Sequence, residues 1–325
     1  MNELITIEAA AALIRAGRPL SLAGPESALD QLPAGNWIGG TIPYFMVAAG
    51  GRVVREGQVF ATDLSNVGQV SVACYGPDEL ARIVGDAPDN GFALTIIPAG
   101  GQCHQRFAAD AANFEGAFLK PTVGWISGVH LSELGQVSPK VYDGRTATKH
   151  TDRVVVAHVG LAAEQMALVE IVNLFEPDDG DTLRFEATSF EVGDCLVNGE
   201  RQNFADYVRA RDLAHGRLPL VGDFAGAHVN ASLQSVGDRQ VVLYAPVFPG
   251  VDYHFAKPVA DYAMAFRQRL AQQDRTGAVM ACNCILNFVF GELEGKAIGG
   301  VEGPVTFGEI AYQLLNQTMV QVRVI

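Results

Sequence analysis

The residues of this chain that are most suggestive of chemistry are Cys282 and Cys284, which flank Asn283 in the stretch MACNCILNF. Structural zinc sites usually use one Cys-x-x-Cys pair together with a second such pair. The sequence contains no Cys-x-x-Cys pair. In a strand both sulfurs share one face, with Cα atoms about 6–7 Å apart, near the upper limit for a disulfide. We therefore expect two packed thiols, with Asn283 on the opposite face contacting a ligand or fixing a turn.

A second candidate is the strand, glycine turn and helix written IIPAGGQCHQRF. Gly100 and Gly101 would let the backbone approach a ligand, and free amides at the helix start near Gln102 would hold a carboxylate or phosphate. A tight connection between strand and helix, which needs glycine for its own backbone geometry, would explain Gly100 and Gly101 equally well. The sequence lacks the phosphate-binding loop and the dinucleotide fingerprint, which disfavours nucleoside triphosphates and dinucleotides.

Catalytic candidates are few. Cys103 and His104 are adjacent, so on a helix they point about 100° apart and cannot act as nucleophile and base with each other. Asp252 and His254 in DYHF would share one face of a strand, which would orient the imidazole. No nucleophile can be identified beside this pair, so an enzyme using Cys103 or the Asp252/His254 pair is an alternative hypothesis rather than the first one.

The seven histidines are scattered, with no pair at i, i+2 or i, i+4, so a zinc hydrolase is disfavoured and no metal site is predicted. One axial histidine is enough for haem. The candidates near expected strand ends or apolar segments are His104, His130, His158, His228 and His254.

Composition restricts the class of protein. The formal net charge is −13, with 36 acidic and 23 basic residues, and a surface of this kind repels nucleic acid and anionic membranes. Glu3 and Glu8 stand where a secretory signal carries positive charge, and no apolar run is long enough to span a membrane. The five cysteines lie too far apart for a disulfide framework. We expect a soluble cytoplasmic protein.

The periodicity of apolar residues predicts a mixed α+β fold with packed helices on mostly antiparallel or mixed sheets. Thr6 is expected to cap a first helix, Asn198-Gly199 to make a hairpin turn, and PVADYAMAFRQRLAQQ to form an amphipathic helix. Alternation at Val320, Val322 and Val324 predicts a last strand with one buried face. The length predicts two domains, 1–161 and 162–325.

Several segments resemble FIST domains, a family of bacterial intracellular sensory domains. They are GNWIGGTIPYF, LKPTVGWISGVHLSE, CLVNGERQNFADYVRA, the Asn-Cys pair at 283–284, EGPVTFGEI and NQTMVQVRV. The resemblance covers both halves of the chain and implies that Trp125, Asn283 and Glu309 lie in ligand-binding segments. It also implies a small polar ligand such as an amino acid, with haem and nitric oxide as the alternative ligands.

The first hypothesis is therefore a cytoplasmic FIST-type sensor that binds a small metabolite at the junction of its two domains, where pockets often form. The predicted ligand-binding residues are Gly100, Gly101, Gln102, His104, Trp125, Asn283 and Glu309. Because the chain has no room for an output domain, a signalling kinase or cyclase would act as a separate partner. A haem-based gas sensor and an enzyme using the same cleft are the alternatives, and the sequence leaves the oligomeric state open.

Overall fold

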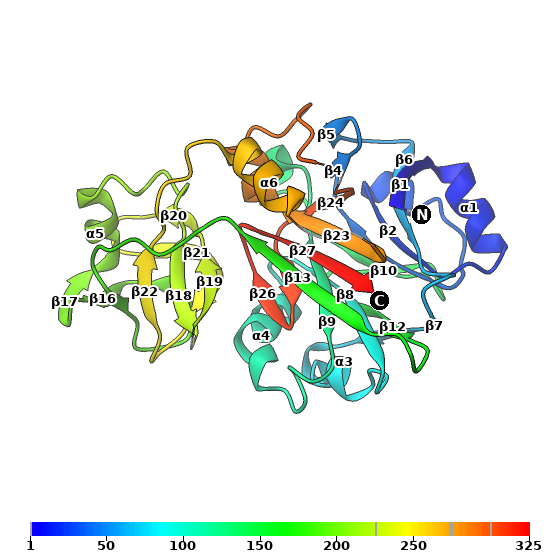
Figure 1. Cartoon of the computed structure of the whole chain (residues 1–325), viewed down its shortest axis with the longest axis horizontal. Helices are drawn as coiled ribbons and strands as arrows, with labels where there is room; N and C mark the ends of the chain where they lie inside the picture. Colours follow the sequence, from blue (N-terminus) through cyan, green and yellow to red (C-terminus); the bar gives the residue numbers. More distant parts are fainter. Residues whose placement is uncertain (1, 225, 273–275, 300) are drawn as a thin grey trace.

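The computed structural model describes residues 2–224, 226–272, 276–299 and 301–325, and it confirms the expected mixed α+β fold class (Figure 1). Strand residues outnumber helical residues, and the strands form mixed or antiparallel sheets that are covered by short helices. Three six-stranded sheets pack together in the main body, and a six-stranded and a three-stranded sheet form a separate lobe at the left of Figure 1.

Sheet I lies at the N-terminal side of the main body and carries two helices, α1 (Ile7–Arg15) and α2 (Glu26–Leu29), on its outer face. Its strand order is β1 (Asn2–Thr6), β6 (Gln58–Asp63), β2 (Leu20–Gly24), β3 (Trp37–Thr41), β10 (Val141–Asp143) and β11 (Thr148–His150). The hydroxyl of Thr6 accepts a hydrogen bond from the amide of Ala9, which confirms the predicted cap of α1. Strands β2 and β3 run parallel, joined by α2.

Sheet II forms the centre of the main body. Its strand order is β26 (Gln313–Leu315), β25 (Glu309–Ala311), β9 (Thr122–Ser127), β8 (Gly91–Pro98), β12 (Val154–Gly160) and β7 (Gln69–Tyr75). Strands β8 and β9 are parallel. Alternation along β8 places Ala93 and Ile97 in the core under α3 (Arg82–Gly85) and α4 (Gln102–Asp110), and Leu94 and Ile96 in the core shared with sheets I and III.

Short 3-10 helices connect several of these elements. They are η1 (Pro77–Glu79), η2 (Ala111–Asn113) and η3 (Leu131–Glu133). The last of them follows β9 directly and shapes the loop that leads towards β10.

Sheet III combines two strands from the first 53 residues with four strands from the second half of the chain. Its strand order is β13 (Ala167–Asn173), β27 (Thr318–Val324), β23 (Ala278–Cys284), β24 (Gly303–Thr306), β4 (Tyr44–Val47) and β5 (Gly50–Val53). Two helices pack beside this sheet, α6 (Tyr262–Ala271), which buries Phe266 and Leu270, and α7 (Ile285–Phe290). The predicted amphipathic helix thus begins at Tyr262, where the carboxylate of Asp261 caps it.

The last strand, β27, departs from the expected pattern of one buried face. Val320 and Val322 lie in the main core, but Gln321 and Arg323 on the other face are also buried. Arg323 pairs there with Glu170 of β13, with 2.9 Å between Nη2 and Oε1. The prediction of a half-exposed strand is wrong because Glu170 of the neighbouring strand β13 lies over the second face and accepts hydrogen bonds from Gln321 and Arg323.

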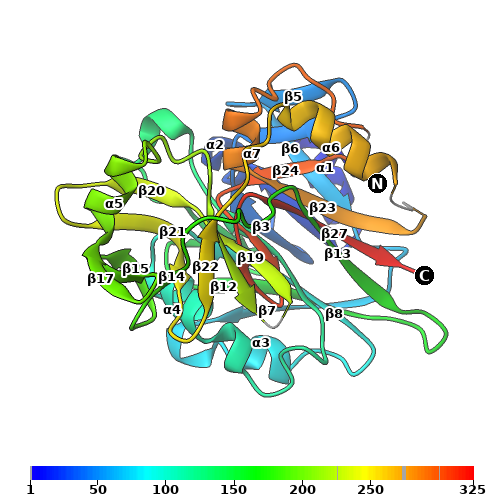
Figure 2. The same ribbon diagram turned by 60° about the vertical axis from the view of Figure 1, so that its left-hand side comes forward.

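The small lobe comprises residues 183–255 and has its own apolar core (Figure 2). One sheet has the order β17 (Glu200–Asn203), β16 (Asp194–Val197), β14 (Leu183–Arg184), β22 (Asp252–Phe255), β18 (Leu220–Phe224) and β19 (Ala227–Ala231). The other contains β15 (Ser189–Val192), β21 (Val241–Val247) and β20 (Leu233–Val236), and α5 (Phe204–Ala210) packs on the lobe core. Asn198 and Gly199 have φ of 51° and 89°, which confirms the predicted hairpin turn.

The expected boundary at residue 161 does not separate the sheets. Strand β25 pairs with β9 in sheet II, and β24 pairs with β4 in sheet III. Both expected ranges therefore contribute to one continuous core. The ranges 1–161 and 162–325 do not correspond to separate sheets, and the lobe that has its own core lies within the second range.

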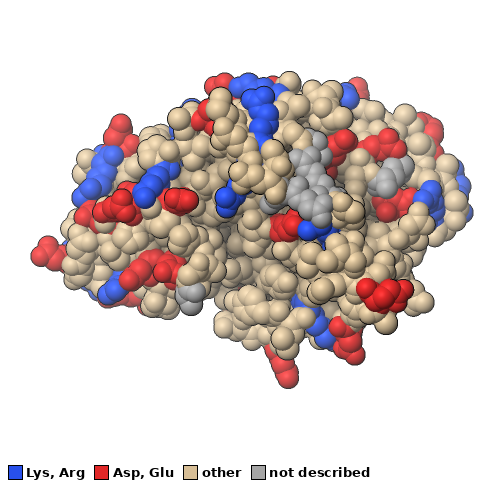
Figure 3. All heavy atoms as spheres, viewed as in Figure 1, with Lys and Arg blue, Asp and Glu red and all other residues tan. Residues whose placement is uncertain are grey.

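The described part of the chain contains no helix that is both long and apolar enough to cross a lipid bilayer. On the face shown in Figure 3, basic side chains lie beside acidic ones and do not form a continuous basic stripe. This distribution agrees with the local ion pairs of the small lobe, such as Arg201 with Glu186 and Arg209 with Asp206.

Candidate functional site

A cavity of about 520 Å³ opens where β2, β3 and β9 end, and we name it the β-end pocket. It is lined by residues from the segments after these strands, by the β5–β6 turn and by the loop after β9, including Glu26, Thr41, Arg55, Gly128, His130 and Glu133. Ligand pockets in proteins are commonly about 300–1,000 Å³. In open sheets with parallel strands, ligands bind outside the carboxyl ends of those strands, and the β-end pocket has this position.

The floor of the pocket is a junction between two sheets. The amide of Gly128, just after β9, donates a 2.8 Å hydrogen bond to the carbonyl of Thr41, the last residue of β3. Thr41 is also held by Lys140, whose amide donates to the Thr41 hydroxyl at 2.9 Å. These bonds bring the ends of sheets I and II together, so the walls of the pocket are anchored by backbone hydrogen bonds to regular strands.

Arg55 and His130 both line the pocket and are in contact with each other. Nη2 of Arg55 lies 2.8 Å from Nε2 and 3.2 Å from Nδ1 of His130. The imidazole stacks on the ring of Tyr44, with centroids 5.4 Å apart and an interplanar angle of 19°. Within the described part of the chain, Arg55 forms no ion pair with a carboxylate. A guanidinium in a cavity is therefore available to an acidic group of a ligand.

The acidic wall of the pocket is already neutralised by lysines. Glu26 accepts hydrogen bonds from Lys140 at 2.7 Å and from Lys149 at 2.6 Å, and Asp30 accepts from Lys149 at 2.7 Å and from Tyr142 at 2.8 Å. Burial acts to raise the pKa of both carboxyls, but these hydrogen bonds hold each pKa below its ordinary value. Both groups are ionised and paired at neutral pH, so neither is free to receive a ligand amine.

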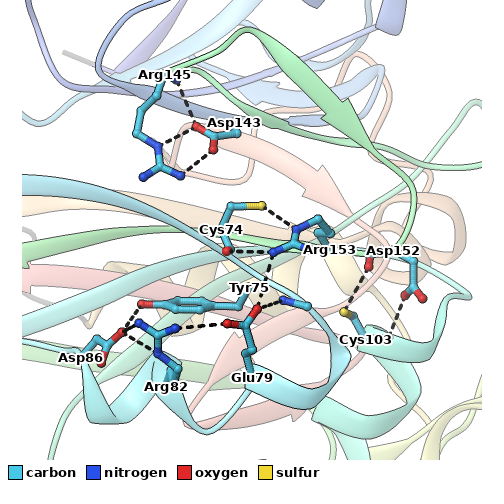
Figure 4. Close-up of polar contacts among 11 residues, drawn as sticks. Cys74, Tyr75, Glu79, Arg82, Asp86, Cys103, Asp143, Arg145, Asp152 and Arg153 are labelled. Atoms are coloured by element: carbon cyan, nitrogen blue, oxygen red, sulfur yellow. Dashed lines mark hydrogen bonds and ion pairs between the residues drawn. The ribbon is translucent and has the colours of Figure 1, made fainter.

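The predicted site at the start of α4 is closed by groups of the protein itself (Figure 4). The carboxylate of Asp152 accepts a 2.8 Å hydrogen bond from the amide of Cys103, and the amide of Gly100 donates to Nδ1 of His104 at 3.3 Å. A Cβ on Gly101 would lie 2.6 Å from Oδ1 of Asp152. Glycine is therefore required here for the close approach of Asp152. Of the two explanations for the glycine pair, the structure favours a tight strand-to-helix connection over a binding site for an anion.

The remaining predicted residue of this segment, Gln102, begins α4, and His104 turns its ring into the molecule. The ring of His104 lies 5.9 Å from that of Phe190 of β15, and burial lowers the pKa of His104 to about 4. His104 is therefore neutral at physiological pH. Among the described residues, Nε2 of His104 has no hydrogen-bond partner.

The catalytic candidates do not form a catalytic arrangement. Burial and the neighbouring Asp152 raise the pKa of Cys103 to about 12, and its thiol donates to the carbonyl of Asp152 (Figure 4). Asp252 is hydrogen-bonded to Arg184 at 3.0 Å, whereas Nε2 of His254 lies 3.4 Å from the hydroxyl of Thr182. Cys103 is thus a protonated thiol at neutral pH, and Asp252 is engaged by Arg184 instead of orienting His254.

Trp125, Asn283 and Glu309 come together in the main core and not at a pocket. Glu309 is opposite Trp125 in the β25–β9 register, and the indole occupies the space where Gly40 lacks a Cβ. Oδ1 of Asn283 accepts a 3.0 Å hydrogen bond from Asn287 in α7, which agrees with the expected role in fixing a turn. All three residues are at most 2% exposed, and none of them lines the β-end pocket.

Glu309 is the most perturbed carboxyl of this core. Its Oε2 accepts hydrogen bonds from the hydroxyl and the amide of Thr318 at 2.8 and 3.3 Å, and the hydroxyl of Thr306 donates to Oε1 at 3.3 Å. Burial nevertheless raises the pKa of Glu309 to about 8. Cys282 and Cys284 are each 1% exposed beside it, and burial raises the pKa of both thiols well above the ordinary value. The Cys-x-Cys stretch therefore packs as two protonated thiols.

The five histidines that were considered for haem occupy different parts of the fold. His130 lines the β-end pocket, whereas His104 is buried near β15 and His158 lies 2.9 Å from the hydroxyl of Tyr75. His228 is exposed on β19, and His254 lies on β22. Within the described ranges, no three His, Cys, Asp or Glu side chains are grouped so that they would hold a metal ion. Haem binding stays a prediction.

The sequence did not predict three residues of the β-end pocket, Thr41, Arg55 and Glu133, as site residues. They come from segments that are far apart in the chain, and none of them belongs to a spaced motif. The signal that could have found Thr41 and Glu133 is positional: Thr41 ends one strand of a parallel pair, and Glu133 lies in the loop that follows the end of another. Polar residues just after parallel strands meet at one edge of a fold.

Fold and site together describe a mixed α+β protein with a charged pocket at the ends of its parallel strands. Residues 5–325 match a family that is described as "Family of unknown function (DUF6976)", and the chain belongs to this family. A comparison with curated proteins finds no match.

Proposed function

We propose that this chain is a small-molecule-binding protein of the sensory type, which takes a small polar metabolite into the β-end pocket and acts through a separate partner protein. The observation that carries this proposal is a cavity of about 520 Å³ that contains a guanidinium, Arg55, without a carboxylate partner among the described residues. The volume fits a metabolite rather than a macromolecule. A cytoplasmic location and a partner such as a kinase or cyclase belong to the same proposal.

The position of the pocket supports binding more than catalysis. Its walls come from strand ends that are tied by backbone hydrogen bonds, so the cavity is formed before a ligand arrives. The residues considered as nucleophile and base, Cys103 and His254, lie elsewhere and are not among its lining residues. Resemblance to FIST domains points in the same direction, since that family is associated with sensing.

A thermal-shift screen tests the proposal directly. The purified chain is heated with amino acids, organic acids and related metabolites, and a ligand is expected to raise the melting temperature in a saturable way. At a concentration of 100 times the dissociation constant, a ligand adds about 2.7 kcal/mol to the free energy of unfolding. For a protein of this size such a gain corresponds to a shift of several degrees.

Two arginine variants locate the response. Arg55→Gln removes the guanidinium of the β-end pocket and is expected to abolish or strongly weaken the shift. Arg52→Gln is the matched control, because Arg52 is exposed on β5, three residues away, and does not line the pocket. A flat response of the wild-type chain across the whole panel, or an equal response of both variants, contradicts the proposal.

A further inference from the structure

Strand β13 is the outermost strand of sheet III, and its outer edge has no partner strand (Figure 1). Just before it, Met166 and Ile325 exchange both backbone hydrogen bonds, at 2.8 and 3.1 Å. Bonded and non-bonded pairs alternate in an antiparallel ladder, so the β13 residues that bond to β27 are Leu168, Glu170 and Val172. The backbone groups that point to the free edge, where no described residue hydrogen-bonds to them, include those of Ala167, Val169 and Ile171.

The free edge of β13 lacks the usual protection against pairing with another chain. Such protection comes from a lysine or proline on the edge, from a bulge or from a very short strand. β13 is seven residues long, pairs with β27 without a register shift and contains one charged residue, Glu170. The carboxylate of Glu170 accepts hydrogen bonds from Gln321 and Arg323 of β27, which neutralise its charge within the sheet. β13 thus offers a regular edge without an unpaired charge.

The other outer strands of the main body are protected. β1 carries the exposed Glu3, and β11 and β26 have only three residues each. The amide of Gly51 in β5 donates to the carbonyl of Lys296, and Arg153 donates to the carbonyl of Cys74 in β7. Three exposed apolar side chains, by contrast, lie on or beside β13, with exposed fractions of 55, 47 and 52%: Met166, Ile171 and Ile325. These observations single out β13 as the edge that pairs.

We propose that β13 pairs antiparallel with β13 of a second copy of this chain, so that the two sheets III form one continuous sheet across a two-fold axis at Val169. A second copy fits because an antiparallel pair is self-complementary: each outward N–H meets an outward C=O of the same edge. An axis at Glu170 would set two carboxylates opposite each other. An axis nearer Asn173 would bring the second copy towards the small lobe, whose Asn230 contacts Asn173. Val169 is the outward residue nearest the middle of the strand that avoids both.

The first measurement is the mass of the full-length wild-type chain in solution, by light scattering over a range of protein concentrations. One chain has a mass of 34.6 kDa, and a concentration-dependent rise to twice this value is expected. Amide hydrogen exchange resolved by residue then locates the interface. In the dimer the amides of Val169 and Ile171 are expected to be protected and to lose this protection on dilution. The amides of Leu168 and Glu170 are expected to stay protected, because they bond to β27 within one chain.

Variants test the backbone and the side chains of this edge separately. Val169→Pro removes an outward N–H without breaking a bond to β27 and is expected to give a monomer, whereas Val169→Thr keeps the N–H and the dimer. Ile171→Lys places a charge on the edge and is expected to weaken dimerisation by at least about tenfold. Met264→Lys is the matched control, because Met264 is 51% exposed on α6, outside sheet III, and this change is expected to leave the dimer intact.

A cysteine variant tests the position of the two-fold axis. Val169→Cys is expected to form an interchain disulfide on oxidation, because Cα atoms of a directly opposed, bonded pair lie about 5.5 Å apart; Met264→Cys is not. A wild-type chain that stays monomeric at every concentration overturns the proposal, as does a dimer that persists in Ile171→Lys or that Val169→Cys fails to cross-link. If circular dichroism shows that Val169→Pro does not fold, Ile171→Lys and the exchange pattern decide. The proposal is independent of the β-end pocket, which no residue of β13 lines.

Discussion

Replacing Glu309 by glutamine is expected to remove a large part of the pH dependence of stability. Glu309 is fully buried, and burial raises its pKa from the ordinary 4.5 to about 8. The folded chain therefore keeps this carboxyl protonated in a pH range where the unfolded chain ionises it. Glutamine has nearly the same shape as the protonated acid, and its carbonyl oxygen can still accept from Thr318.

The magnitude follows from linkage. A carboxyl whose folded pKa is raised contributes its full stabilisation below the unfolded pKa and loses it as pH rises towards the folded pKa. One pKa unit corresponds to about 1.4 kcal/mol, so the free energy of unfolding falls by on the order of 4 to 5 kcal/mol between pH 4.5 and about pH 8. Between pH 6 and 7.5 the wild-type chain should lose about 2 kcal/mol more than Glu309→Gln.

Chemical unfolding in urea at pH 6, 6.75 and 7.5 measures this difference. Wild type, Glu309→Gln and the exposed control Glu164→Gln are compared in one buffer series, so that contributions from all other titrating groups cancel. The control is expected to run parallel to wild type. If the curves of wild type and Glu309→Gln are also parallel, the carboxyl is ionised in the folded chain and the reasoning is wrong.

Three further predictions concern the region around α4 and the accessibility of the cysteines. Asp152→Ala removes the acceptor of the Cys103 amide and is expected to lower the free energy of unfolding by about 1 kcal/mol; an unchanged urea midpoint would speak against a capping role. Burial lowers the pKa of His104 to about 4, so the contribution of the neutral imidazole to stability is lost as pH falls from about 6.5 towards 4. His104→Leu should therefore lose less stability than wild type over this range, and chemical unfolding of both proteins at pH 4.5 and 6.5 checks this. Among the cysteines only Cys74 is half-buried and the others are buried, so a thiol reagent is expected to modify at most one cysteine of the native chain; rapid modification of two or more would contradict the burial described here.

Local features of the fold were predictable because a few neighbouring residues decide them. Thr6 caps α1 through its own hydroxyl, and Asn198-Gly199 turns the β16–β17 hairpin because both residues tolerate positive φ. Asp261 caps α6 in the same way as Thr6 caps α1. In each case the interacting groups are at most three residues apart, so the sequence contains the whole interaction.

Features that depend on distant pairing were not predictable. The alternation of Val320 and Val322 indicates a strand correctly, but the burial of Gln321 and Arg323 depends on Glu170, some 150 residues away in the chain. Glu309 has no sequence signature of a buried acid. Its environment arises because β25 joins β9 while β27 and β23 close over it, which brings Thr318 and Cys284 against the carboxyl.

By itself, the sequence determined the fold class, the helix caps and the tight turns, because these follow from periodicity and from contacts between near neighbours. It also determined that Cys282 and Cys284 pack as thiols, since the spacing lacks the partners that a metal needs. Only the tertiary structure decided where the proposed ligand pocket lies. Arg55 and His130 are 75 residues apart and meet because β3 and β9 of different sheets are joined at Thr41 and Gly128. Chain spacing contains no information about such a junction, which exists only after the sheets have packed.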